Sequence, residues 1–244
     1  TGLADPAPVI HTLMTDPLLA SRYKLDGIVT TVDAVNGSRT LDNHPEAVKQ
    51  AAVADRILLT KADLAGDSAI INLSERLNRL NPAAPKLKVW NGKVDPDFIL
   101  DAGLFNSRDK IPDVQKWLND EAYGAGHDHH HHHHDRNRHD DRIQAFVFTH
   151  DEPVSWPALA FALELLVSSR GENLLRIKGI VHAREHEKPL AIHGVQHVFH
   201  PPAALPDWPD ADRRTRIVFI TRDLGRQAIE DVLRGVLGAT DTNG

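Results

Sequence analysis

The segment Ala54–Leu64 constrains the fold of this chain more than any other part of the sequence. Three aliphatic residues, Ile57-Leu58-Leu59, stand in a row between polar residues. This pattern is typical of a short strand buried on both faces of a parallel sheet. The tetrad Thr60-Lys61-Ala62-Asp63 follows directly. It is therefore expected at the carboxyl end of the strand, the edge at which open α/β sheets bind ligands.

The tetrad has the chemistry of a base-recognition element. A carboxylate such as Asp63 can accept two parallel hydrogen bonds from N1–H and the 2-amino group of guanine, an edge that adenine does not offer. The stem of Lys61 can lie along the purine face. The pattern is similar to the guanine-specificity motif Asn-Lys-x-Asp, with Thr60 in the place of asparagine. A capped strand-to-helix turn is the structural alternative for so short a motif.

A phosphate-binding element is missing from the same sequence. No Gly-x-x-x-x-Gly-Lys-Ser/Thr motif occurs in the 244 residues. The sequence therefore has a candidate base-binding motif without a phosphate-binding loop. The chain also begins at Thr1-Gly2, without a methionine and within an α/β pattern. We therefore expect it to be the C-terminal part of a longer protein.

Helix and strand signals alternate over residues 1–107. Helices are predicted at 8–14, 16–23, 45–53, 68–80 and near 97–102, and strands at 27–33, 57–59 and 86–90. Strands separated by helices of this length form right-handed crossovers and a parallel sheet. Asp33 closes the first of these strands, where it would either lie near the phosphates of a nucleotide or cap the next turn.

Residues 108–142 form a polar, low-complexity segment, and we place the domain boundary within it. Its histidines are His127, His129, His130, His131, His132, His133, His134 and His139. A purification tag is one interpretation of six consecutive histidines, but the internal position and the neighbouring aspartates favour a metal-collecting loop. Imidazole binds zinc, cobalt, nickel and copper. A flexible loop loses chain entropy on binding, so modest affinity and loose stoichiometry are expected.

Residues 143–238 predict a second, smaller α+β unit. Strands are predicted at 143–149, 174–181, 190–199 and 215–221, and helices at 155–169 and 225–237. Three of these strands follow one another, which favours a largely antiparallel sheet with helices on one face.

Two groups of side chains in this unit have alternative interpretations. His193 and His197 would share one face of the strand 190–199, either as a metal site or as ordinary surface histidines. Arg176, Lys178, Arg214 and Arg216 would either present a basic face to an acidic partner or lie on solvated strands.

Composition narrows the class of protein. Hydrophobic residues make up 41% and charged residues 25%, as in ordinary globular domains. The net charge of −6 argues against a broad nucleic-acid interface. The absence of cysteine excludes disulfides and thiolate metal sites within these residues and is compatible with a reducing cytosol. No apolar stretch approaches the ~20 residues of a membrane span.

Six stretches, in order, resemble the CobW-like GTPases, P-loop metallochaperones of the SIMIBI class, over nearly the whole chain. They are Thr1–Pro6, Leu25–Ala34, Ala54–Asp63, Leu175–Ile180, Gly194–Gln196 and Arg214–Ile220. The resemblance implies the back half of a P-loop NTPase α/β domain (1–107), a His-rich linker (108–142) and a CobW-type α+β C-terminal domain (143–238). It also implies GTP or GDP with Mg²⁺ in the intact protein, and delivery of zinc, cobalt or iron to a client metalloprotein.

The resemblance assigns site residues one by one. Lys61 and Asp63 match the guanine-specificity motif, and Thr60 can donate a hydrogen bond to a neighbouring segment. Gly2 matches the glycine that closes the family's Glu-Ser/Thr-Ser/Thr-Gly segment, whose backbone N–H faces the γ-phosphate. The family's glutamate and Cys-x-Cys-Cys motif do not occur in the sequence. A metal- and client-binding module without nucleotide hydrolysis is therefore the alternative, while an ATP-using P-loop enzyme is disfavoured by Asp63.

Overall fold

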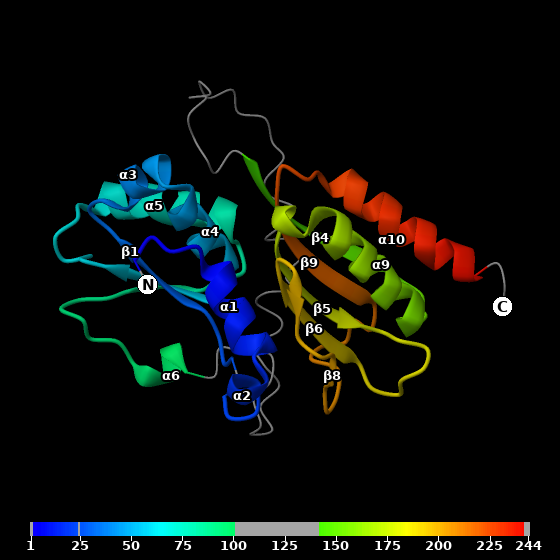
Figure 1. The fold of residues 1–244 in the computed structure, drawn as a ribbon. Helices are drawn as coiled ribbons and strands as arrows, with labels where there is room; N and C mark the ends of the chain where they lie inside the picture. Colours follow the sequence, from blue (N-terminus) through cyan, green and yellow to red (C-terminus); the bar gives the residue numbers. More distant parts are fainter. Residues whose placement is uncertain (1, 24, 101–141, 242–244) are drawn as a thin grey trace. The chain divides into compact units, whose positions relative to one another are not determined.

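The computed structural model describes residues 2–23, 25–100 and 142–241, which fall into two compact units (Figure 1). Of the described residues, the first contains those up to Leu100 together with residues 142–145, and the second extends from Phe146 to the C-terminal helix. The domain boundary predicted within 108–142 lies almost wholly outside the described residues and stays a prediction.

The described strands of the first unit form a three-stranded parallel sheet in the order β1-β2-β3. The strands are β1 (Val29–Asp33), β2 (Arg56–Thr60) and β3 (Lys86–Lys88). The helices are α1 (Pro6–Thr15), α2 (Pro17–Ala20), α3 (Gly37–Asn43), α4 (Pro45–Val53), α5 (Asp67–Leu80) and α6 (Pro96–Ile99). Figure 1 shows α3, α4 and α5 on one side of the sheet. The predicted parallel α/β architecture is confirmed.

The central strand β2 is fixed by burial and by one amide side chain. Ile57, Leu58 and Leu59 are at most 7% exposed, as the aliphatic run predicts. Asn81, itself buried at the end of α5, donates hydrogen bonds to three carbonyl oxygens at the end of α4 and just after it, those of residues 51, 52 and 54, at 2.8–3.1 Å. A buried polar group must be paired in this way, and here the pairing joins the end of α5 to the end of α4.

The second unit is a six-stranded sheet covered by two helices. Its strands run in the order β4-β9-β5-β6-β7, with β8 paired to β6, and β5 is antiparallel to both β6 and β9. They are β4 (Ile143–His150), β5 (Leu174–Val181), β6 (Leu190–Val195), β7 (Val198–Phe199), β8 (Ala203–Ala204) and β9 (Thr215–Arg222). The helices are α9 (Trp156–Arg170), the 3-10 turn η2 (Gly171–Asn173) and α10 (Arg226–Asp241).

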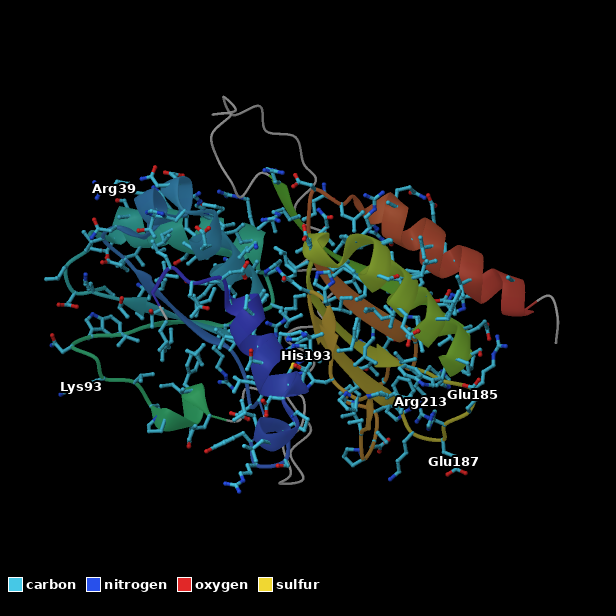
Figure 2. All side chains as sticks on the ribbon, viewed as in Figure 1. Arg39, Lys93, Glu185, Glu187, His193 and Arg213 are labelled. Atoms are coloured by element: carbon cyan, nitrogen blue, oxygen red, sulfur yellow. The ribbon has the colours of Figure 1, made fainter. Side chains whose placement is uncertain are left out.

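Helices α9 and α10 pack together along one face of this sheet (Figure 1), as predicted. The core between them is built on Phe148, Leu159 and Phe219, each of which is fully buried. Full burial of such a side chain stabilises the folded state by about 1.5–3 kcal/mol. The start of α9 is secured from the β5–β6 loop, since the Glu185 carboxylate accepts the Trp156 backbone N–H at 2.9 Å. Figure 2 labels Glu185 and Glu187 on that loop.

The predicted helix at 16–23 and strand at 86–90 are shorter in the structure, ending at Ala20 and Lys88, and two further differences change the elements themselves. The strand predicted at 190–199 is a hairpin: β6 ends at Val195, Gln196 and His197 form the turn, and β7 follows. Gln196 adopts a positive φ of 51°, which no pattern of apolar residues reveals. Helix α3 was not predicted, because only Gly37 and Leu41 of its seven residues are buried and its N-cap makes no side-chain hydrogen bond.

None of the described helices combines the length and the apolar character needed to cross a bilayer.

Candidate functional site

The tetrad 60–63 lies at the carboxyl end of β2, where the sequence places it. Thr60 is the last residue of the strand, and its carbonyl accepts the Ala34 N–H at 2.8 Å while its hydroxyl donates to the Val32 carbonyl at 3.4 Å. Lys61 follows with a left-handed backbone, φ 56°. These contacts hold the turn against the end of β1 and leave the side chains of Lys61 and Asp63 exposed to solvent.

Asp33, the last residue of β1, connects this turn to the turn that follows β1. In the parallel register Asp33 stands opposite Thr60. Its Oδ2 accepts a hydrogen bond from Lys61 Nζ at 2.6 Å. Its Oδ1 accepts the backbone N–H groups of Val35 and Asn36 at 2.8 and 3.0 Å. Of the two roles left open for Asp33, the structure shows the cap of the turn that follows β1, and the carboxylate is also the partner of Lys61.

The environment of Asp33 keeps its carboxyl group ionised. Partial burial opposes ionisation, but hydrogen bonds from Lys61, Asn36 and Val35 outweigh it and lower the pKa of Asp33 to about 2. The strand-end edge therefore carries a fixed ion pair beside the exposed carboxylate of Asp63.

Gly2 is held by α4 and not by the strand-end turn. Its backbone is left-handed, φ 61°, and its carbonyl accepts a hydrogen bond from Gln50 Nε2 at 2.8 Å. The same amide nitrogen donates to the carbonyl of Ala4 at 2.7 Å. Lys49 forms an ion pair with Asp5 at 2.6 Å. The segment 2–5 is thus fastened to α4 by two adjacent side chains.

The histidines predicted to collect metal, His127, His129–His134 and His139, lie outside the described residues. Within the part of the chain that the structure describes, no group of three or more histidine, aspartate or glutamate side chains is arranged to hold a metal ion.

The expectation that His193 and His197 share a strand face is wrong. His193 lies on β6 (Figure 2), is 5% exposed and stacks on the ring of His200 with centroids 4.9 Å apart. His197 is exposed in the turn after β6, close against Gly171. The hairpin turn therefore separates the two rings, which a continuous strand would have aligned.

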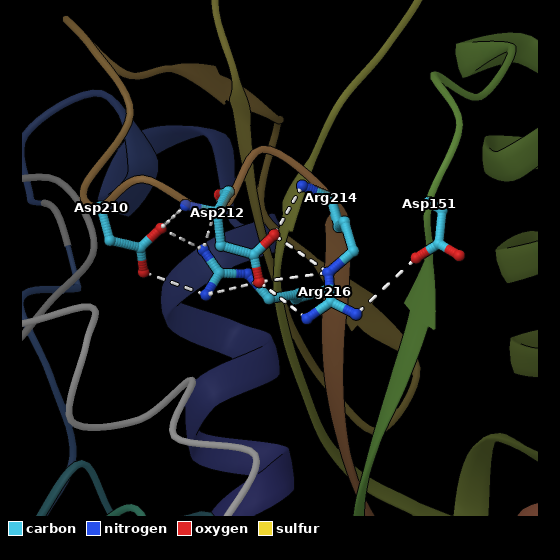
Figure 3. Close-up of polar contacts among 5 residues, drawn as sticks. All are labelled: Asp151, Asp210, Asp212, Arg214 and Arg216. Carbon is cyan, nitrogen blue, oxygen red and sulfur yellow. Dashed lines mark hydrogen bonds and ion pairs between the residues drawn. The ribbon is translucent and has the colours of Figure 1, made fainter.

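The basic residues of the second unit are not on solvated strands. Arg176, Lys178 and Arg216 are each at most 7% exposed. Arg216 binds both oxygens of Asp210 at 2.8 and 3.0 Å, and Arg214 binds both oxygens of Asp212 (Figure 3). Hydrogen bonds from Arg214, against the opposing effect of burial, lower the pKa of Asp212. This network ties the segment before β9 to the strand itself.

Two families match the chain in succession. Residues 1–88 match the nucleotide-binding domain described as CobW/HypB/UreG, and residues 143–237 match the cobalamin synthesis protein cobW C-terminal domain.

Individual relatives match over different lengths. The zinc chaperone YjiA of Escherichia coli K12 is 30% identical over 236 residues, which are 97% of this chain and 69% of that protein. The zinc-regulated GTPase metalloprotein activator 1 of Saccharomyces cerevisiae is 26% identical, with 97% of this chain and 61% of that protein covered. The protein of the same name from Schizosaccharomyces pombe is 32% identical over 96 residues, 39% of this chain and 23% of its own length.

A solved structure shares the fold. The crystal structure of Zn(II)-bound YjiA GTPase from E. coli superimposes with a TM-score of 0.72 at 29% identity, covering 97% of this chain and 69% of that one.

Proposed function

The chain belongs to the CobW family, with the nucleotide-binding domain followed by the C-terminal domain, and we propose that it is part of a GTP-binding metallochaperone that delivers zinc to a client protein. Zinc is favoured over cobalt or iron because the relatives named above are a zinc chaperone and zinc-regulated activators. Binding and hydrolysis of GTP, with Mg²⁺ on its phosphates, would drive the release of metal or client.

One observation carries the nucleotide part of this proposal. Lys61 and Asp63 stand in an exposed turn at the carboxyl end of a buried parallel strand. Asp63 can accept both hydrogen bonds of the guanine edge, and Lys61 can lie along the purine face. Thr60 holds the turn against the end of β1 by its hydrogen bonds with Val32 and Ala34. By its match to the family's Glu-Ser/Thr-Ser/Thr-Gly segment, Gly2 would present its backbone N–H to the γ-phosphate, and its carbonyl is held by Gln50 of α4.

Metal capture is assigned to the histidine-rich segment. Eight imidazoles, those of His127, His129–His134 and His139, offer several overlapping ligand sets for Zn²⁺. A segment of this kind serves as a buffer that raises the local metal concentration rather than as one defined site.

A second function is favoured by the missing phosphate motif. Without Gly-x-x-x-x-Gly-Lys-Ser/Thr among its 244 residues, this chain could bind metal and client while hydrolysing no nucleotide. The two functions differ in whether guanine nucleotides bind at the turn 60–63.

Base preference in nucleotide binding tests the proposal. Asp63→Ala is expected to weaken GDP binding by about 2–4 kcal/mol, the worth of a charge-assisted bidentate contact, and to leave ADP binding unchanged. Asp63→Asn is expected to shift preference toward xanthosine diphosphate, whose C2 carbonyl accepts a hydrogen bond from the asparagine amide. Fluorescence titration with labelled diphosphates measures both effects.

Asp67 offers a matched control for these variants. It is an exposed carboxylate at the first turn of α5, four residues beyond Asp63. Asp67→Ala is expected to leave the ratio of GDP to ADP affinity unchanged. Equal affinity of the unmodified protein for GDP and ADP would contradict the proposal and favour the module without nucleotide chemistry.

A further inference from the structure

We propose that Asp33 is a positioning residue for guanine-nucleotide binding, which holds the Lys61 side chain along the strand-end edge so that its stem can cover the purine ring. This inference rests on the proposed function and adds to it a residue from a different strand.

The contact is made by the ends of two neighbouring strands. Asp33 closes β1 and Lys61 follows β2, 28 residues later, and their charged atoms lie 2.6 Å apart. The parallel register brings them together, since Asp33 pairs with Thr60. The contact therefore depends on the sheet and not on the local turn of either residue.

The carboxylate of Asp33 is itself held in place from its other side. Its Oδ1 accepts two backbone N–H groups, those of Val35 and Asn36, and its Oδ2 lies 3.3 Å from the Asn36 side-chain amide. The aspartate side chain is 24% exposed, whereas that of Lys61 is 54% exposed. A fixed anion thus restrains a flexible, exposed cation, which would otherwise sample many rotamers.

Restraining Lys61 serves a base site in two ways. The ammonium group is drawn toward β1, which stretches the aliphatic stem across the edge where a purine would stack. The positive charge is also neutralised by Asp33, so that it does not compete with guanine for the Asp63 carboxylate. Asp33 contributes affinity for any purine, whereas Asp63 contributes discrimination between purines.

A double-mutant cycle tests whether Asp33 acts through Lys61. Asp33→Asn keeps an oxygen to accept the Val35 and Asn36 N–H groups but removes the negative charge. Lys61→Met keeps a stem of similar length without the ammonium group. We expect Asp33→Asn alone to weaken GDP binding about fivefold, and to weaken it less than twofold when Lys61 is already methionine.

Inosine diphosphate, which lacks the 2-amino group, separates positioning from base reading. The ratio of GDP to inosine diphosphate affinity is expected to stay constant in Asp33→Asn and to collapse toward one in Asp63→Ala. The matched control is Asp42→Asn, which removes the charge from another ion pair of the same unit, that of Asp42 with Arg76 at 2.8 Å. It is expected to leave GDP affinity unchanged.

The outcomes distinguish the two proposals. An equal loss of GDP affinity on Asp33→Asn in both backgrounds would mean that Asp33 only caps its turn, and would overturn the inference while guanine preference stands. An unmodified protein that binds GDP no better than ADP would overturn the proposed function and the inference with it. Lys61→Met tests the ion pair independently, because it alters an exposed side chain and should fold normally.

Discussion

At the scale of single residues, the ionisation of Asp33 is expected to contribute to stability. Its pKa lies near 2 in the folded chain, below the ordinary value of 3.8, so the folded state holds fewer protons than the unfolded state between these pH values. The stabilisation is therefore present above pH 4 and is lost as pH falls through 4 toward 2.

Asp33→Asn tests this linkage. The variant is expected to lower the free energy of unfolding by about 1 kcal/mol at pH 7, after screening at a partly exposed site, and by less as the pH approaches 3. Urea denaturation of both proteins between pH 3 and 7 measures the difference. A difference that stays constant over this range would show that the charge of Asp33 is not involved.

The sequence was enough to place Lys61 and Asp63 at the carboxyl end of β2, but not to predict the contact between the ends of β1 and β2. The sequence locates Lys61 and Asp63 after a buried strand because the aliphatic run is local. The sequence did not decide whether Asp33 caps a turn or lies near the phosphates. Its contact with Lys61 could not be predicted, because the two residues are 28 positions apart and meet only through the strand register. The prediction that His193 and His197 share a strand face failed for a related reason, because one residue with positive φ, Gln196, turns the chain between them.

At the scale of elements, the segment before β9 depends on a buried cation. The Arg216 side chain is 6% exposed and binds Asp210 with both terminal nitrogens (Figure 3). Asp210→Ala is expected to lower the free energy of unfolding by about 2–4 kcal/mol, because the buried guanidinium keeps only its contacts with Asp212. Chemical denaturation measures the loss.

Asp151 provides the control for this element. It lies 3.7 Å from Arg214, and its side chain is 80% exposed. Asp151→Ala is expected to change the free energy of unfolding by less than about 0.5 kcal/mol, as is usual for solvated pairs. Equal effects of Asp210→Ala and Asp151→Ala would contradict the view that burial of Arg216 makes the first pair important.

Elements were predicted where apolar periodicity is strong. Helix α5 places Ile70, Leu73, Leu77 and Leu80 on its buried face, and its predicted bounds differ from the observed ones by one residue. The short helix α3 has no such stripe and was missed. Strands β5 and β9 were predicted from their alternation, but the burial of Arg176, Lys178 and Arg216 was not, because a charged residue on an alternating strand normally faces water.

At the scale of the whole molecule, base recognition and phosphate chemistry come from different parts of a nucleotide site. Oriented phosphate donors and Mg²⁺ supply most of the catalysis in GTP hydrolysis, and the motif that holds them does not occur in these 244 residues. The isolated chain is therefore expected to release no phosphate from GTP above a buffer blank. A phosphate-release assay on protein free of contaminating GTPases checks this, and a rate well above the blank would contradict it.

The histidine-rich segment should bind metal independently of both folded units. Binding of Zn²⁺, Co²⁺ or Ni²⁺ requires neutral imidazoles, so affinity is expected to fall as pH drops through about 6.5, the usual pKa of histidine. More than one ion should bind per chain, since His127, His129–His134 and His139 form several ligand sets. Deletion of residues 126–140 should abolish this binding and leave the thermal stability of the metal-free protein nearly unchanged, since this stretch of the sequence holds only polar residues and glycine and offers no apolar side chain to a core. Isothermal titration of both proteins at pH 7.5 and 5.5 measures the effect. One tight site that survives the deletion would contradict the proposal and place metal binding within the folded units, where the described residues offer no cluster of three ligands.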